Sequence, residues 1–159
     1  MSDFNNDKKW SDRFIVEIKR ILGEHLISEA PIEEDISHNT DLMVLKLDAI
    51  RVACRIRKYY YFTIYPNDIT IRSKRPSGSE TELSKIINGW GDYMFYGFSD
   101  ETESQLVSWK LISLDNLREW IIKNSHITSQ EKQNKDNSSS FITIDTNKME
   151  QNIIYRQSN

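Results

Sequence analysis

Residues 50–57 alternate between two kinds of side chain, and this pattern constrains the fold most strongly. Val52, Cys54 and Ile56 are apolar, whereas Arg51, Arg55 and Arg57 fall between them with Ala53. Because successive side chains of a strand point to opposite faces, the pattern predicts a half-buried β-strand with one cationic face. Cys54 is then expected to be a small core residue.

Further strands and helices follow from local patterns. Strands are predicted at 41–47, 69–74, 93–98 and 106–112, and residues 59–65 are expected to extend or follow the strand at 50–57. Helices are predicted from Ser11 to about Ser28, from a cap at Ser79 through Leu83, Ile86 and Ile87, and after a cap at Ser113. Ser79 and Glu82 match a capping box for the short middle helix.

This element order predicts an α/β or α+β fold in which helices flank a mixed central β-sheet. The order of the expected core is α-β-β-β-α-β, and short turns such as Pro66-Asn67-Asp68 favour antiparallel hairpins among the middle strands. Residues 1–9 are expected to be a flexible N-terminus, 10–124 one globular domain, and 125–159 a polar linker and tail. Within that tail, residues 126–140 are expected to be disordered, and 141–144 form either a short strand or a docking segment.

Positive charge is concentrated in the middle of an otherwise acidic chain. The segment 46–75 carries eight cations and two anions, although the whole chain has a net charge of −3. An antiparallel pairing of the strands at 50–57 and 69–74 would merge the cations into one surface for phosphate oxygens, with tyrosines beside it for stacking on bases. The expected nucleic-acid-binding residues are Arg51, Arg55, Arg57, Arg72, Lys74, Arg75, Tyr59 and Tyr61. Alternatively, the cations pair with acidic helices and the tyrosines belong to the core.

The order of elements from about residue 10 to 112 resembles the PD-(D/E)XK nuclease-like superfamily, also called the restriction-endonuclease-like fold. The resemblance implies a Mg²⁺ site for phosphodiester cleavage, by an endonuclease or exonuclease, with Asp41, Glu82 and Glu17 as ligands and Lys85 stabilising the charged phosphate. The family's Glu-x-Lys motif would fall at Ala53-Cys54-Arg55, where the acidic residue is missing and arginine replaces lysine. Each candidate also has a structural explanation, such as a capping role for Glu82.

The segment Gly89-Trp90-Gly91-Asp92 is the remaining unusual feature. Two glycines around a tryptophan predict a tight turn with either an exposed ring or close packing, and Asp92 adds a carboxylate. The three histidines have no partners at metal-ligand spacing, and the single cysteine excludes an internal disulfide.

Taken together, these patterns predict a cytoplasmic nucleic-acid-binding protein on a nuclease-like fold, with DNA favoured over RNA and no membrane contact. Mg²⁺ is the only cofactor expected, and only for an active enzyme. The alternative is a small non-enzymatic interaction protein, of the type that phages and mobile elements encode, whose basic face binds a protein partner.

Overall fold

The computed structural model describes residues 2–29, 42–44, 50–127 and 130–158. The chain divides into two compact units, Met1–Ile50 and Arg51–Asn159. The division differs from the expected single domain over residues 10–124, because every described strand after residue 50 pairs only with strands of the second unit.

The N-terminal unit consists of two helices and a two-stranded antiparallel sheet. Its elements are α1 (Ser2–Asp12), α2 (Ile15–Leu26), β1 (Ile27–Glu29) and β2 (Leu42–Val44). The N-terminal segment that was expected to be flexible is helical from Ser2, and the ion pair between Lys8 and Asp12 spans one turn of α1. The helix predicted from Ser11 to about Ser28 is present as α2 over part of that range, and its Ile18 and Ile21, three residues apart, are buried.

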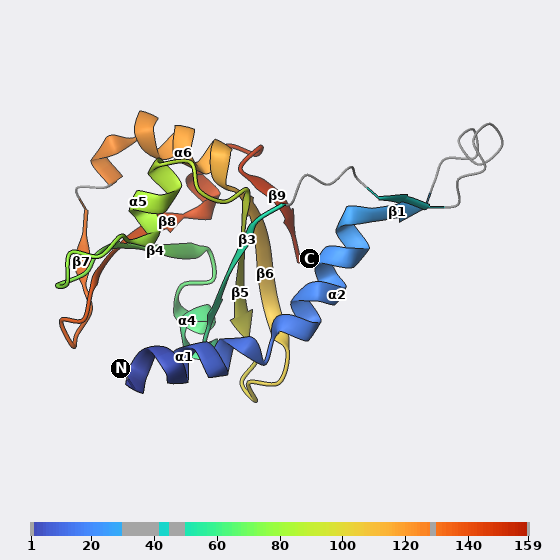
Figure 1. The fold of residues 1–159 in the computed structure, drawn as a ribbon, viewed down its shortest axis with the longest axis horizontal. Coiled ribbons are helices and arrows are strands. Elements are labelled where there is room, and N and C mark those ends of the chain that lie inside the picture. The colour runs from blue at the N-terminus through green and yellow to red at the C-terminus, as the bar shows by residue number, and fades with distance from the viewer. Residues whose placement is uncertain (1, 30–41, 45–49, 128–129, 159) are drawn as a thin grey trace. The chain divides into compact units, whose positions relative to one another are not determined.

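The C-terminal unit contains two sheets and confirms the α+β class. A mixed four-stranded sheet has the order β3-β5-β6-β9, with β3 (Val52–Arg57) parallel to β5 (Tyr93–Ser99) and antiparallel pairs to β6 (Leu106–Ser113) and β9 (Ile154–Gln157). A three-stranded antiparallel sheet has the order β4-β8-β7, formed by β4 (Asp68–Lys74), β8 (Ser140–Asp145) and β7 (Lys132–Gln133). Figure 1 shows both sheets.

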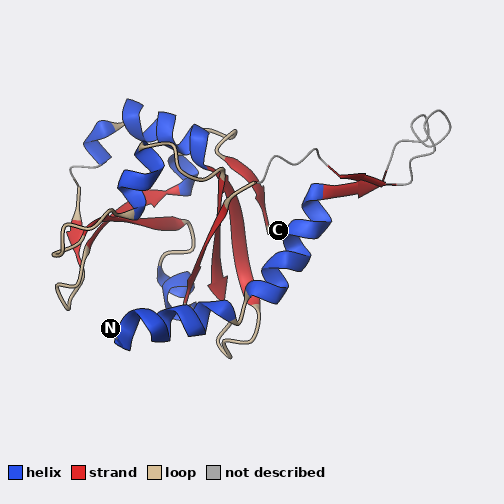
Figure 2. Cartoon of the chain, viewed as in Figure 1, coloured by secondary structure: helices blue, strands red, loops and turns tan. Residues whose placement is uncertain are grey.

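Short helices connect these strands (Figure 2). They are α4 (Tyr59–Ile64), α5 (Glu82–Ile87) and α6 (Leu114–Lys123), with the 3₁₀ turns η1 (Ser125–Ile127) and η2 (Thr146–Lys148). The Ser113 side chain accepts a hydrogen bond from the Asn116 amide, which confirms the predicted cap of α6. Helices α5 and α6 lie side by side.

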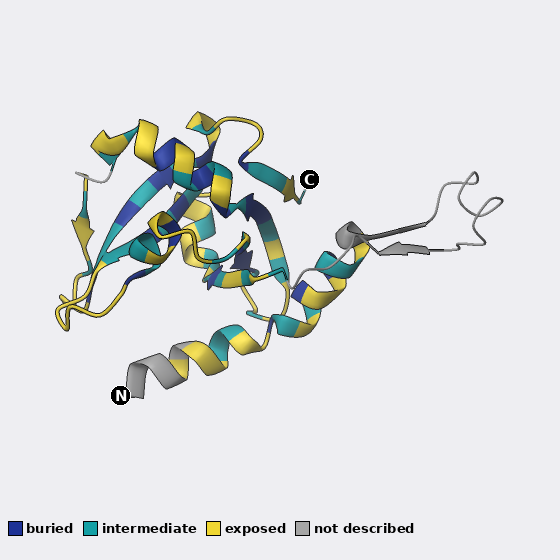
Figure 3. Ribbon diagram, turned by 45° about the horizontal axis from the view of Figure 1, so that its top comes forward, coloured by how far each residue is buried: buried dark blue, intermediate teal, exposed yellow. Residues whose placement is uncertain are grey.

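The core of the C-terminal unit lies between the two sheets and α6. Its buried side chains come from both sheets and both neighbouring helices, and include Ile71, Met94, Ile112, Leu117 and Ile142. Figure 3 colours the residues by burial, and the buried side chains of this unit lie mainly on β4, β5, β6, β8 and α6. The strand predicted at 69–74 is confirmed as β4, in which Ile69 and Ile71 are both buried.

The prediction that the arginine-bearing strands form one sheet is wrong. β3 belongs to the four-stranded sheet and β4 to the three-stranded sheet, so Arg51, Arg55 and Arg57 do not share a sheet with Arg72 and Lys74. The chain between the two strands forms helix α4 instead of an extended hairpin arm. Residues 59–65 were therefore also wrongly expected to be strand, and β3 pairs with β5 through a crossover.

The segment expected to be a tail is part of the fold. β8 lies between β4 and β7, and its side chains Ile142 and Ile144 are buried. β9 adds the last strand to the four-stranded sheet. The polar residues around these short apolar runs form turns, so the low hydropathy of the region does not reflect a lack of structure. Among the helices of the described residues, none has the length and apolar character needed to cross a membrane.

Candidate nucleic-acid interface

A surface groove in the C-terminal unit brings together several residues singled out in the sequence. It encloses about 290 Å³. Its lining residues come from the start of β3, from α5, from the following loop and from the start of β5 and α6: Arg51, Val52, Ala53, Glu82, Lys85, Ile86, Trp90, Gly91, Met94 and Leu114. We call it the Trp90 groove. Most of its lining is apolar, with charged side chains from β3 and α5.

The loop that carries Trp90 is held in a defined conformation. Gly89 and Gly91 have φ angles of +79° and +82°, in the left-handed region that favours glycine. The Trp90 amide donates a hydrogen bond of 2.9 Å to the carbonyl of Lys85. A β-carbon at Gly91 would lie 3.1 Å from Leu114 Cδ1, so this residue also allows the loop to approach α6 closely. The indole is nevertheless 63% exposed, which selects the exposed-ring alternative of the sequence prediction.

Asp92 ties the end of this loop to β3. Its Oδ2 accepts a hydrogen bond of 2.7 Å from the Arg51 amide, and its own amide donates to the Arg51 carbonyl at 2.9 Å. The carbonyl of Asp92 accepts a bond from the Leu114 amide. The carboxylate of Asp92 therefore positions the backbone at the edge of the groove.

Two cationic side chains at the border of the groove are accessible to a ligand. Arg51 and Lys85 are both exposed. Within the described residues, neither forms an ion pair with a carboxylate. Both were expected at the site, Arg51 as a nucleic-acid contact and Lys85 as a catalytic residue, and the structure places them on the same groove.

Glu82 balances the charge of a third cation. Its Oε2 accepts a hydrogen bond of 2.7 Å from Arg55 Nη1 and one of 3.1 Å from the Arg72 amide, and the Arg55 and Glu82 side chains are 22% and 24% exposed. The predicted capping role of Glu82 is wrong. Thr81 is the N-cap of α5 and forms the capping box with Ser84, so the helix starts at Glu82 and leaves this carboxylate to link β3 with β4.

Arg57 and α4 form an aromatic surface at the other end of β3. The guanidinium carbon of Arg57 lies 4.0 Å from the centre of the Tyr61 ring, and its Nη1 donates to Thr70 Oγ1 at 3.2 Å. Tyr60 packs edge-to-face on Tyr61 and is 65% exposed. Tyr59 faces inward against Phe62, which itself packs on Phe98. Tyr61 thus lies beside an arginine as expected, whereas Tyr59 contacts the core.

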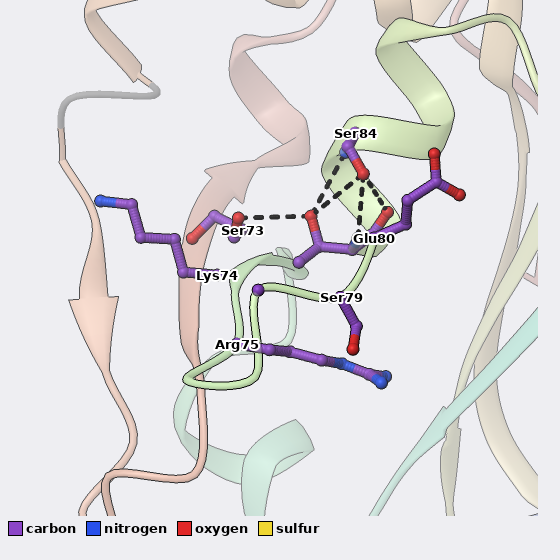
Figure 4. A pocket seen from close by; sticks show the side chains of 8 residues that line it. Ser73, Lys74, Arg75, Ser79, Glu80 and Ser84 are labelled. Atoms are coloured by element: carbon purple, nitrogen blue, oxygen red, sulfur yellow. Dashed lines mark hydrogen bonds between the residues drawn. The ribbon is translucent and has the colours of Figure 1, made fainter.

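The remaining predicted cations lie apart from the groove. Lys74 forms an ion pair of 2.9 Å with Glu131, and Arg72 is only partly exposed on β4. Arg75 lines a second hollow of about 320 Å³ with the serines of its loop. The Thr81 and Ser84 side chains in this hollow bond to each other and to the backbone. The Arg75 side chain lies alongside Ser79 (Figure 4). The hydroxyls of Thr81 and Ser84 therefore serve the cap of α5.

Within the described residues, the side chains predicted as metal ligands do not form a metal site. Asp41 lies outside those residues, Glu17 belongs to α2 of the N-terminal unit, and Glu82 contacts Arg55. Of the His, Cys, Asp and Glu side chains within the described ranges, no three gather as ligands of one metal ion. Cys54 is exposed instead of belonging to the core, although Ile56 on the same face of β3 is buried.

Comparisons with known proteins returned no relatives. No family model matches the chain, and neither a curated protein nor a solved structure is significantly similar to it.

Proposed function

We propose that the C-terminal unit binds nucleic acid at the Trp90 groove. The observation that carries this proposal is an exposed tryptophan fixed between two left-handed glycines, with Arg51 and Lys85 on the same groove. An aromatic ring with a free face stacks on any base, and arginine and lysine bind phosphate oxygens.

The apolar lining of the groove supports a flat ligand such as a base. Val52, Ile86 and Met94 contribute aliphatic surface, and Ala53 leaves space between them. A base inserted here would place its faces against aliphatic carbon and indole, while its phosphates would meet the cations. The hydrogen bonds around Asp92 hold the loop before the ligand arrives, so little conformational entropy is lost on binding.

Removal of the indole tests the proposal directly. Trp90→Ala should weaken binding of a fluorescein-labelled oligonucleotide at least about fivefold in an anisotropy titration, since stacking of one base contributes about 1–3 kcal/mol. Trp90→Phe should retain part of the affinity. Ile122→Ala, which truncates another exposed apolar side chain, on α6, is the matched control and should bind like the wild type. Unchanged binding by Trp90→Ala would place the ligand elsewhere.

The same titration separates the two function classes. If the wild-type protein binds no oligonucleotide of DNA or RNA, the proposal fails and a protein partner becomes the better explanation of the exposed cations and aromatics. Adding Mg²⁺ to the titration shows whether the labelled strand is shortened, which is the outcome expected from the nuclease-like resemblance. An Asp41→Asn variant should then abolish cleavage.

A further inference from the structure

We infer that the ligand is single-stranded and lies along β3, from the Trp90 groove to the exposed aromatic face of α4. This inference rests on the proposed function and adds the class of nucleic acid and the length of the site. The aromatic face consists of Tyr60, Tyr61, Ile64 and Tyr65, which are 65%, 39%, 45% and 53% exposed.

The two ends of this track lie on one face of one strand. Ala53 lines the groove, and alternation along β3 puts Arg55 and Arg57 on the same face, where they contact Glu82 of α5 and Thr70 of β4. The ligand therefore passes along the open edge that β3 presents in the described sheet. Arg57 in turn contacts Tyr61 of α4, which follows β3 directly (Figure 1). From Arg51 to Arg57 the strand rises by roughly 20 Å, which about four extended nucleotides can cover.

The aromatic face of α4 suits a ligand that has a planar ring and carries a negative charge close to that ring. No residue of α4 is fully buried, and Tyr60 and Tyr61 meet edge-to-face with ring centres 5.5 Å apart. Arg57 occupies one face of the Tyr61 ring, so Tyr60 is the more accessible platform for a base. The Arg57 guanidinium supplies a cation beside these rings, as Arg51 and Lys85 do beside Trp90.

The charge density of the track favours a single strand over a duplex. Arg55 is neutralised by Glu82, so the cations assigned to the track are Arg51 and Arg57 at the two ends of β3 and Lys85 of α5. Double-stranded DNA carries one charge per about 1.7 Å of its axis, and its bases are stacked on each other and closed to Trp90. A single strand presents fewer phosphates and exposes its bases to the two aromatic platforms.

Oligonucleotide length and strandedness test the inference with the full chain. We measure anisotropy with fluorescein-labelled oligothymidylates of two to ten nucleotides and with a ten-base-pair duplex. The affinity should rise steeply up to about four to six nucleotides and then level off. The duplex should bind at least tenfold more weakly than the ten-nucleotide strand.

Variants locate the two ends of the track. Tyr60→Ala combined with Tyr65→Ala should weaken binding of the ten-nucleotide strand several-fold and leave the weak binding of the dinucleotide unchanged. Trp90→Ala should weaken both, and Ile122→Ala neither. Circular dichroism melting of each variant establishes that it is folded before its affinity is compared.

Three results overturn the inference while the proposed function stands. They are equal affinity for duplex and single strand, an affinity that does not depend on length beyond two nucleotides, and wild-type affinity of a folded Tyr60→Ala/Tyr65→Ala variant for the ten-nucleotide strand. If no oligonucleotide binds, the proposed function itself fails, and the inference with it.

Discussion

At the scale of single residues, Lys110 of β6 is the one charged side chain among the buried residues that the structure describes. It is only 9% exposed, and its Nζ donates one long hydrogen bond of 3.4 Å to the carbonyl of Pro66. Burial lowers the pKa of the Lys110 ammonium below its ordinary value of 10.5. The charged side chain is therefore a destabilising feature of the folded state.

Replacing this side chain by an apolar one should stabilise the protein. Lys110→Met should raise the free energy of unfolding at pH 7 by about 1 kcal/mol, because it removes a desolvated charge. The folded-state pKa is depressed, so the penalty is present in full below it and is lost as the pH rises through it towards 10.5. Urea unfolding at pH 7 and pH 10 should show a smaller difference at the higher pH. Lys123→Met, at an exposed position, is the control and should not raise the free energy of unfolding. If Lys110→Met and the wild type are equally stable at pH 7, the argument is contradicted.

At the scale of elements, β8 holds the three-stranded sheet together. Its Ile142 is fully buried and pairs with Ile71 of β4, which is also fully buried. Ile142→Ala should lower the free energy of unfolding by about 3 kcal/mol, through lost burial and the cavity left behind. Thr143→Ala, at the next and only partly buried position, is the control and should cost less than about 1 kcal/mol.

Truncation is the stronger form of the same argument. A chain ending at Ser125 lacks β7, β8 and β9, and so leaves β4 without the strand that pairs with it among the described residues and β6 with one free edge. It should lose its cooperative thermal transition. A melting temperature close to that of the full chain would instead show that residues 126–159 are a dispensable tail.

The pair of strands β4 and β8 also contains two carboxylates that repel each other. Asp68 of β4 lies opposite Asp145 of β8, and its pKa is raised, first by burial and then by the Asp145 charge. The charged form is thus disfavoured in the folded state above the raised pKa, and this cost disappears as the pH falls below the ordinary value of 3.8. Asp68→Asn should stabilise the protein by about 0.5 kcal/mol at pH 7 and by nothing at pH 3. Glu119→Gln, at an exposed position of α6, controls for the loss of one negative charge, and a gain that persists at pH 3 would assign the effect to another cause.

The elements that sequence predicted well are those with a local signal. β4, β5 and β6 follow from apolar runs between turn residues, and the start of α6 follows from Ser113. The prediction for residues 59–64 was wrong because aromatic and β-branched residues favour strands. In the structure these residues form helix α4, from which Phe62 packs against Phe98. The run at 141–144 was predicted as either a short strand or a docking segment, and it is strand β8. The sequence did not show that this strand completes the fold, because its partner β4 lies some 70 residues earlier in the chain.

The candidate site shows the same division between local and long-range information. From sequence alone, Gly89-Trp90-Gly91 indicated a tight turn with either an exposed ring or close packing, and alternation singled out Arg51. The sequence did not show that these residues would meet, because the Trp90 groove joins β3, α5 and α6 across more than 60 positions of the chain. The contact between Glu82 and Arg55 was missed for a smaller reason, a displacement of the α5 cap from Ser79 to Thr81.

At the scale of the whole molecule, charge differs between the two units. Residues 51–159 carry 15 cationic and 13 anionic side chains, whereas residues 1–50 carry 6 and 11. A chain with a net charge of −3 does not attract a polyanion as a whole. Binding must therefore depend on short-range contacts of the few cations along β3 and on stacking.

Salt dependence measures how many of these cations contact phosphate. With Arg51, Lys85 and Arg57 each neutralising one phosphate of a single strand, the logarithm of the association constant should fall with the logarithm of the salt concentration with a slope of about −2. Arg51→Gln should reduce the slope to about −1.4, because one counterion fewer is released, while Lys135→Gln, in the turn before β8, should leave it unchanged. Trp90→Ala should lower the affinity at every salt concentration without changing the slope, since stacking releases no counterions. If the slope stays near −2 in Arg51→Gln, the phosphates contact other cations. If the slope becomes steeper in Trp90→Ala, the groove and the phosphate contacts are not independent.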